Sequence, residues 1–297
     1  MGSEQKEQSN NNKIAIFLKR LISTVLLWTI VLAALFAPWR ALSLSTFFII
    51  ITLLTTIGML EFYSCIEKKK LPAYKSFGML LGIIYTITVF SIHAFFKHIS
   101  HENEILIFLI FSLLAITIFA RRLAAPVNSD GFIALGTTFL GLLYIPFLFS
   151  FVQLIYFVFG SYVLLFFMLL TKFSDSGAYI FGSLLGKHKM APTISPGKTW
   201  EGFAGAILMP IAVGFLTKFL SGKNLSFVTN TEVVAIGIIL GIGAVVGDLI
   251  ESVFKRECGI KDSGNYFPGV GGILDVLDSI LFNAPIMYFY LYCKFNF

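Results

Sequence analysis

The sequence predicts an all-α, polytopic integral membrane protein with about nine transmembrane helices and a cytoplasmic N-terminus. The first of three observations is composition. Of the 297 residues, 57% are hydrophobic and only 13% are charged, whereas an average soluble domain has about 25% charged residues. The second is a series of apolar runs, each close to the roughly 20 residues with which a helix crosses a bilayer. The third is an uneven distribution of Lys and Arg between the segments that join these runs.

The apolar runs define the expected helices. They lie near 21–38, 42–60, 76–96, 104–120, 131–150, 153–171, 200–219, 232–251 and 273–293. The weakest division falls within 131–171, where only Gln153 interrupts the apolar residues. Segment 176–190 is rich in glycine and is expected to form a short interfacial or partly inserted helix. The chain is thus expected to have a disordered cytoplasmic tail (1–20), N-terminal transmembrane helices (21–171) and a C-terminal transmembrane region (172–297).

The basic residues set the orientation. With the N-terminus in the cytoplasm, 17 of the 22 Lys and Arg residues fall in cytoplasmic segments, as the positive-inside rule requires. This distribution explains the net charge of +6 without a nucleic-acid partner. Lys19 and Arg20 precede the first apolar run as in a signal peptide, but no small-residue cleavage site follows, so an uncleaved first helix is expected. These features suggest a multi-pass protein of a bacterial inner membrane.

Two polar segments, 172–201 and 252–279, are then expected on the same cytoplasmic face. One group of polar residues at the end of the eighth run has helical i, i+3, i+4, i+7 spacing: Asp248, Glu251, Ser252 and Lys255. A second group begins the ninth run with i, i+3, i+4 spacing: Asp275, Asp278 and Ser279. Residues so spaced share one helix face, so two antiparallel helices can direct carboxylates toward each other at the membrane surface.

The segment between these groups contains Pro268-Gly-Val-Gly-Gly272. Glycines let backbone N–H groups approach an anion closely, and the helix N-terminus that follows also favours negative charge. Carboxylates bind the divalent cations that accompany phosphates. The segment therefore predicts a metal-phosphate site, and the alternative is a set of interfacial ion pairs flanking a glycine turn.

The first polar segment contains Asp175-Ser-Gly-Ala-Tyr179 and Ser195-Pro-Gly-Lys-Thr-Trp-Glu-Gly202. Its Pro-Gly-Lys-Thr piece lacks the spacing and the preceding strand of a P-loop. Ser195, Lys198 and Thr199 remain candidate phosphate contacts ahead of a helix N-terminus. Glu61, at the inner end of the second run, is interpreted as a surface charge, and the alternative is a contribution to a polar cavity that reaches the site.

These motifs resemble the signature of the phosphatidate cytidylyltransferases, also called CDP-diacylglycerol synthases. The resemblance rests on Lys255-Arg256, Lys261-Asp262, Pro268-Gly-x-Gly-Gly272 and Asp275-x-x-Asp278-Ser279, with the two upstream motifs. It covers roughly the C-terminal 125 residues. Two departures stand out: Val270 and Val276 occupy positions where the family commonly has His and Arg. If that His and Arg contact nucleotide or lipid phosphate, those contacts are missing here or supplied by other residues.

The resemblance implies transfer of a cytidylyl group from CTP to phosphatidate in a homodimeric enzyme of the lipid bilayer. It implies Mg²⁺ held by Asp248 and Asp275, with room for a second cation. The catalytic residues so implied are Asp248, Lys255, Arg256, Lys261, Asp262 and Asp275. The substrate-binding residues are Asp175, Ser195, Lys198, Thr199, Ser252, Gly269, Gly271, Gly272, Asp278 and Ser279. Lys255, Arg256 and Lys261 would hold the triphosphate or the lipid phosphate, and residues 172–297 would form the catalytic region.

Three other functions are compatible with the sequence. A CTP-dependent kinase of isoprenoid alcohols would share a basic and acidic cytosolic site, but would release CDP instead of pyrophosphate. A membrane transporter would often show inverted repeats and charges near the middle of the bilayer. No repeat is visible here, and the charges gather at one face. A non-catalytic family member is suggested by Val270 and Val276.

Overall fold

The computed structural model describes residues 28–95, 101–124, 130–260, 263–264 and 272–296. Within these ranges, eight helices are long and apolar enough to cross a membrane, which confirms the polytopic, helical architecture. The bounds of the first elements are α2 (Arg40–Lys68), α3 (Lys75–Phe95), α4 (His101–Leu123), α5 (Gly131–Leu142), η1 (Leu143–Phe147), α6 (Leu148–Leu154) and η2 (Ile155–Phe159). They are followed by α7 (Ser161–Leu185), β1 (Lys189–Ala191), β2 (Ser195–Thr199), α8 (Trp200–Ser221), η3 (Gly222–Leu225), α9 (Asn230–Glu257) and α10 (Ile273–Asn296).

Two boundaries differ from the prediction. The expected break near Gln153 lies within one candidate span, Gly131–Phe159, where π-helical turns continue the helix and Gln153 is buried. The break comes instead at Gly160, whose φ of 91° is a conformation that favours glycine. The expected interfacial helix at 176–190 is also wrong, because its first part continues α7 to Leu185 and a β-hairpin follows. Of the first expected span, residues 28–36 are helical, and the remainder and the predicted tail lie outside the described residues.

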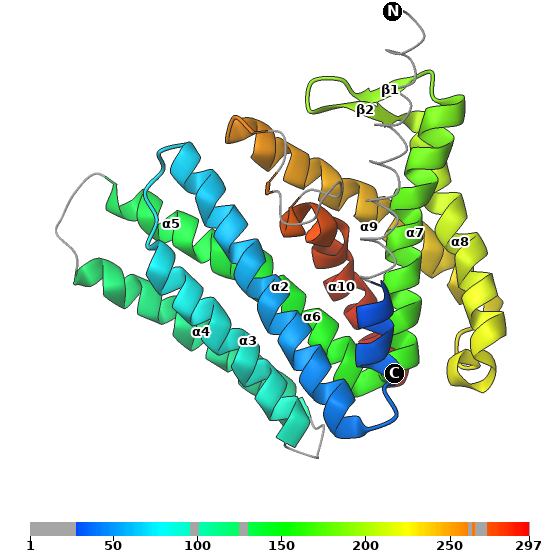
Figure 1. The fold of residues 1–297 in the computed structure, drawn as a ribbon, viewed down its shortest axis with the longest axis horizontal. Helices are drawn as coiled ribbons and strands as arrows, with labels where there is room; N and C mark the ends of the chain where they lie inside the picture. Colours follow the sequence, from blue (N-terminus) through cyan, green and yellow to red (C-terminus); the bar gives the residue numbers. More distant parts are fainter. Residues whose placement is uncertain (1–27, 96–100, 125–129, 261–262, 265–271, 297) are drawn as a thin grey trace, which may run out of the picture.

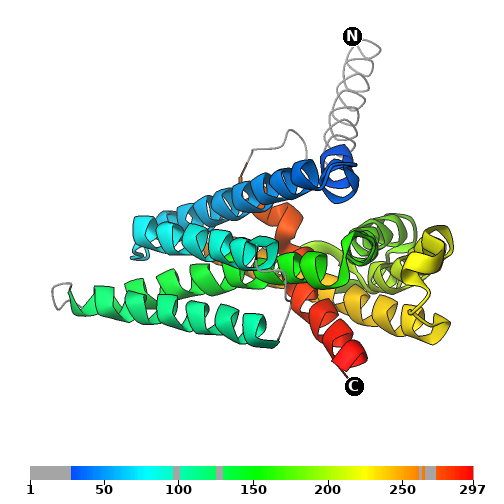
Figure 2. The same cartoon turned by 90° about the horizontal axis from the view of Figure 1, so that it is seen from below.

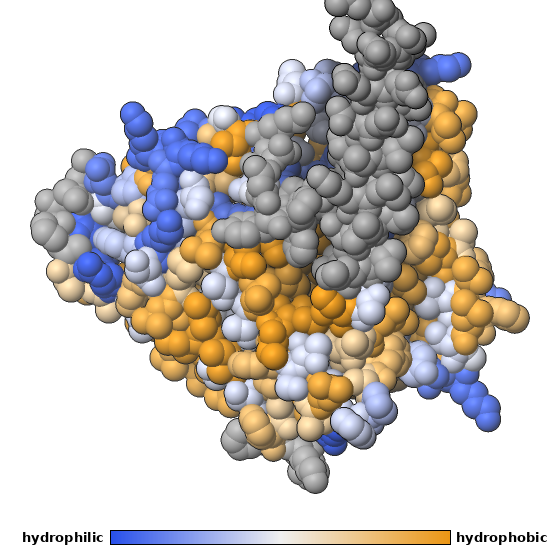
Figure 3. All heavy atoms as spheres, in the orientation of Figure 1, coloured by the Kyte–Doolittle hydropathy of each residue, from blue (hydrophilic) through white to orange (hydrophobic). Residues whose placement is uncertain are grey.

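The helices form two groups with α10 between them. Figures 1 and 2 show α2 to α6 on one side and α7, α8 and α9 on the other, and α10 contacts α2, α6, α7 and α9. The surface in Figure 3 is largely apolar across the helices, with hydrophilic residues gathered toward the end where α2 finishes at Lys68. Because α10 contacts both groups of helices, its first turn receives side chains from both of them.

The contact between α7 and α8 depends on glycines that face each other. A Cβ added to Gly177 would collide with the carbonyl oxygen of Gly205, and one added to Gly205 would lie 2.5 Å from the carbonyl oxygen of Gly177. Small residues let membrane helices approach this closely. The contact lies two residues after Asp175, and the neighbouring Ser174 hydroxyl donates to the carbonyl oxygen of Ala206 in the second turn of α8.

Gly177→Ala is expected to destabilise the protein by about 1–3 kcal/mol, the usual cost of overpacking a tight contact. Thermal unfolding in detergent, followed by circular dichroism, measures the effect as a lower unfolding temperature. Gly136→Ala is the matched control, because no atom of the described residues outside the adjoining helix backbone and neighbours lies within 4 Å of the added Cβ. Alanine also favours a helix over glycine by up to about 1 kcal/mol. Equal unfolding temperatures for the two variants would contradict the role of this contact.

Candidate active site

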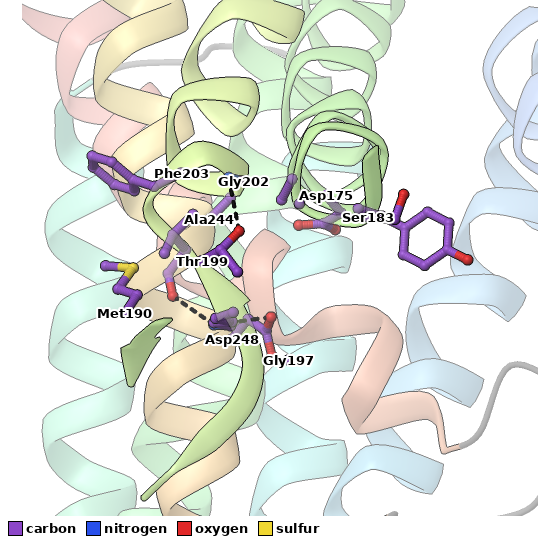
Figure 4. Close-up of a pocket in the computed structure, with 14 residues that line it drawn as sticks. Asp175, Ser183, Met190, Gly197, Thr199, Gly202, Phe203, Ala244 and Asp248 are labelled. Carbon is purple, nitrogen blue, oxygen red and sulfur yellow. Dashed lines mark hydrogen bonds and ion pairs between the residues drawn. The ribbon is translucent and has the colours of Figure 1, made fainter. Parts of the chain in front are cut away.

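A cavity of ≈ 370 Å³ lies between α7, the β-hairpin, α8 and α9. Figure 4 shows the labelled side chains gathered from these four elements around it. Four of the predicted site residues line it: Asp175, Lys198, Thr199 and Asp248. Aromatic walls come from Tyr179 on α7 and Phe203 on α8. The structure thus joins the first polar segment to the end of α9, which lies about 50 residues further along the chain.

The hairpin places Lys198 over this cavity. At the start of α8, the Thr199 hydroxyl oxygen accepts a hydrogen bond from Gly202 N at 3.1 Å, the usual arrangement of a helix N-cap. Glu201 accepts from the backbone N–H groups of Lys187 and His188, which ties the entry of the hairpin to the same helix end. Lys198 directly precedes this N-cap. Its Nζ lies 3.0 Å from Asp248 Oδ2 and donates to the carbonyl oxygen of Val245.

An acidic triad adjoins the cavity. One carboxylate oxygen each from Asp248, Glu251 and Asp278 lies within 4.8 Å of the others. Asp248 and Glu251 are one turn apart on α9, and Gly247 lets α10 pass close enough to bring Asp278 to them. Glu251 Oε1 is buried and has no hydrogen-bond partner among the described residues. A buried carboxylate oxygen without a partner is costly, so the triad is suited to a cation.

Lys255 lies beside the triad and links it to the start of α10. Its ammonium group lies 2.6 Å from both Glu251 Oε2 and Asp275 Oδ1. Asp275 Oδ2 accepts from Gly272 N at 2.8 Å and from the Ser263 hydroxyl at 2.9 Å. Asp275 is therefore engaged in capping α10 and in an ion pair, and the third member of the triad is Asp278.

Glu61 contributes to the same region from α2. It is buried, and its carboxylate accepts hydrogen bonds from Ile273 N at 2.9 Å and Leu274 N at 2.7 Å. The Ser263 hydroxyl donates to it at 3.3 Å. Glu61 thus caps the first turn of α10 from the other helix group, which corrects its interpretation as a surface charge. Of the backbone N–H groups that the sequence suggested for an anion, that of Gly272 is bonded to Asp275, and those of Ile273 and Leu274 are bonded to Glu61.

Lys172 on α7 completes the polar cluster. Its Nζ donates to the carbonyl oxygen of Val276 at 2.6 Å, to the Ser279 hydroxyl at 2.9 Å and to Asp175 Oδ2 at 3.1 Å. The Ser279 hydroxyl in turn donates to Asp175 Oδ2 at 3.0 Å. This network connects a carboxylate of the cavity to the first turns of α10.

The charges of the cluster leave it negative. It contains six carboxylates, Glu61, Asp175, Asp248, Glu251, Asp275 and Asp278, and three ammonium groups, Lys172, Lys198 and Lys255. Counted as formal charges, the difference is three negative charges among the described residues. Oxygen-only ligands are those that Mg²⁺ and other hard cations prefer. Both the charge and the ligand type of the triad therefore fit one divalent cation.

The other predicted residues lie at the edge of the polar cluster or outside the described ranges. Ser252 Oγ lies 3.5 Å from Asp248 Oδ1, and the exposed Arg256 donates to the carbonyl oxygen of Ile194 in the hairpin turn at 3.3 Å. Ser195 begins β2 and does not line the cavity. Four predicted residues lie outside the described part of the chain: Lys261, Asp262, Gly269 and Gly271. Burial raises the pKa of the Cys258 thiol, which makes this thiol less reactive than an exposed one.

Sequence reasoning missed three residues of this cluster. Glu251 was placed on the polar face of its helix but was not assigned to the metal. Lys172 is only one of the basic residues assigned to the cytoplasmic face, and Glu61 is interpreted as a surface charge, with a place in a polar cavity as the alternative. The available signal was the rarity of charged residues in apolar helices, since such residues normally mark paired or functional positions.

Comparison with known proteins agrees with the geometry. Residues 18–294 match the model of the cytidylyltransferase family. A phosphatidate cytidylyltransferase of Bacillus subtilis is 31% identical over 248 residues, which are 80% of this chain and 87% of the relative. One from Staphylococcus haemolyticus is 44% identical over 128 residues, 43% of this chain and 48% of the relative, and one from Haemophilus influenzae is 41% identical over 138 residues, 45% and 47% of the two chains. The match to the staphylococcal relative thus spans about half of its length. From the extent of the family match, this chain belongs to the cytidylyltransferase family.

Proposed function

We propose that this protein transfers a cytidylyl group from CTP to phosphatidate, forming CDP-diacylglycerol and pyrophosphate in phospholipid biosynthesis. The observation that carries the proposal is the position of Asp248, which belongs both to the cavity and to the acidic triad. A nucleotide bound in the cavity would have its phosphates between the ammonium group of Lys198 and the triad. Family membership and the names of the relatives agree with this reaction.

The cavity suits the nucleotide. Its volume of ≈ 370 Å³ lies within the range of about 300–1,000 Å³ typical of small-molecule sites. Phe203 and Tyr179 offer aromatic surface for a base. Lys198 would hold the β- and γ-phosphates, because an ammonium group stabilises the charge that develops on a leaving pyrophosphate.

We assign the divalent cation, Mg²⁺ in the simplest case, to Asp248, Glu251 and Asp278. When bound, it would neutralise phosphate charge and so favour nucleophilic attack at phosphorus. Lys255 would hold Glu251 in place through their ion pair of 2.6 Å. Asp275, the second ligand expected from the sequence, would act by fixing the start of α10. A second cation and the role of Lys261 and Asp262 stay predictions of the resemblance.

The proposed transfer needs little acid–base chemistry from the protein. An oxygen of the lipid phosphate forms a bond to the α-phosphorus of CTP, and the bond to the β-phosphate bridge breaks, so that pyrophosphate leaves with the electron pair. The attacking oxygen already carries charge, so positioning and charge neutralisation dominate. We place the site on the cytoplasmic face of the membrane, since that is where the positive-inside rule puts the basic ends of the helices.

The test is an assay of the purified full chain in detergent with phosphatidate, CTP and Mg²⁺. Pyrophosphate release and a lipid product with the mass of CDP-diacylglycerol are expected, and both should require all three components. Release of CDP from CTP, with an isoprenoid alcohol as the phosphoryl acceptor, would favour the kinase instead. A chain that binds CTP but forms no lipid product would contradict the proposal. The homodimer implied by the resemblance is tested separately by the mass of the detergent-solubilised protein.

A further inference from the structure

Lys172 lies on α7 between residues that line two different cavities. On one side its partner Asp175 lines the ≈ 370 Å³ cavity. On the other side lies a small apolar cavity of ≈ 50 Å³ between the helix at 28–36, α2, α6, α7 and α10. Leu164 and Met168 line that cavity from α7, and they precede Lys172 by two turns and one turn on the same helix face. Lys172 thus marks the boundary between apolar and polar surroundings.

The first turns of α10 have the same division. Leu277 and Ile280 line the apolar cavity, whereas the neighbouring Asp278 belongs to the triad and Ser279 contacts Lys172. A substrate with an anionic phosphate and apolar chains needs such a boundary, with a cation at its polar edge.

We propose that Lys172 binds the phosphate of the lipid substrate and that its ammonium group holds the attacking oxygen beside the nucleotide cavity. This rests on the proposed function. In the structure the three N–H groups of Lys172 have three acceptors. Asp175 is the exchangeable one, because its side chain is 40% exposed and forms the longest of the three contacts. A phosphate oxygen replaces the Asp175 carboxylate, while Val276 and Ser279 keep the ammonium group in position.

The neighbouring position on α10 supports this role. Residues 276 and 279 are one turn apart and share a helix face, and the carbonyl oxygen of Val276 accepts from Lys172. An arginine at position 276 would therefore extend its guanidinium group from the same helix face that Lys172 contacts. Position 276 is one of the two departures from the family pattern, and Lys172 supplies from α7 a positive charge that valine does not.

The test compares Lys172→Met with the double variant that adds Val276→Arg. Loss of a charged hydrogen bond costs about 1.5–3 kcal/mol, so Lys172→Met should lower kcat/KM for phosphatidate about 10- to 150-fold. The KM for CTP should change by less than about twofold, because the substitution leaves the binding of the nucleotide unchanged. In the double variant, Val276→Arg should restore at least about a tenth of the lost activity. The single variant Lys172→Arg should retain most of the wild-type activity.

Two controls make the result specific. Lys75→Met removes a partly exposed lysine that pairs only with Glu67 in the described structure and should leave both kinetic constants unchanged. Binding of phosphatidate against diacylglycerol, which lacks the phosphate, can be measured by native mass spectrometry even without turnover. The wild type should prefer phosphatidate, and Lys172→Met should lose that preference.

Two outcomes would overturn the proposal. One is an unchanged preference for phosphatidate in Lys172→Met. The other is a loss of kcat/KM that is equal for phosphatidate and for CTP and that Val276→Arg fails to restore. Such a result would indicate a structural role for Lys172. A wild type that prefers phosphatidate but forms no CDP-diacylglycerol would refute the proposed reaction and leave the lipid-phosphate site standing.

Discussion

Glu251→Gln and Asp278→Asn are each expected to lower the rate of cytidylyl transfer about a thousandfold. The reason is that a metal-bound phosphate draws several kcal/mol of transition-state stabilisation from the cation, and each 1.36 kcal/mol corresponds to about a tenfold change in rate. Both substitutions keep the shape of the side chain and remove one negative charge from the triad. Steady-state pyrophosphate release, measured over a range of Mg²⁺ concentrations, gives the size of the effect.

The same measurement separates the triad from other carboxylates nearby. Glu257→Gln is the matched control, because Glu257 lies on α9 less than two turns after Glu251 but is exposed. It should retain nearly full activity at every Mg²⁺ concentration. A loss in Glu257→Gln as large as that in Glu251→Gln would show that general surface charge, and not the triad, is responsible.

Metal binding distinguishes Asp278 from Asp275 directly. Mn²⁺ also prefers oxygen ligands, and its binding to the detergent-solubilised protein can be followed by electron paramagnetic resonance without turnover. Asp278→Asn should weaken Mn²⁺ binding by at least about tenfold, since even a residue outside the ligand set commonly changes affinity by 10- to 100-fold. Asp275→Asn should have the smaller effect. The reverse order would restore Asp275 as the ligand.

The sequence was most informative where helical spacing alone decides the outcome. The spacing of Asp248, Glu251 and Lys255 predicts a shared face, and in the structure these residues share contacts at the triad. Apolar run length likewise predicted most of the membrane helices. Both succeed because a helix has a fixed period and a bilayer has a nearly fixed thickness.

Contacts between distant segments were beyond this kind of reasoning. Lys172 lies about 100 residues from Val276 and Glu61 more than 200 residues from Ile273, so no local period relates them. The hairpin also escaped prediction, because Ser195-Pro-Gly-Lys-Thr199 has no alternating apolar pattern. The break at Gly160 depends on a backbone conformation that several other glycines in the chain do not share. In each case tertiary structure, not local preference, decides the result.

Glu61→Ala is expected to destabilise the protein by about 2–4 kcal/mol and to reduce activity as well. The variant leaves the N–H groups of Ile273 and Leu274 buried without their acceptor, and each unsatisfied buried group costs about 1–3 kcal/mol. It also removes the cap of α10, worth about 0.5–2 kcal/mol. Since these costs overlap, the total is less than their sum. Thermal unfolding in detergent measures the loss.

The size and order of the effects identify the cap. Glu61→Gln retains one acceptor oxygen but turns an NH₂ group toward backbone donors, so its unfolding temperature should fall between those of the wild type and Glu61→Ala. Glu67→Ala is the control on the same helix. Its carboxylate is 57% exposed and pairs with Lys75, and such surface pairs contribute about 0–1 kcal/mol. Equal losses for Glu61→Ala and Glu67→Ala would contradict the cap. The predicted order would mean that α2, far from the signature in sequence, holds the helix that carries Asp275 and Asp278.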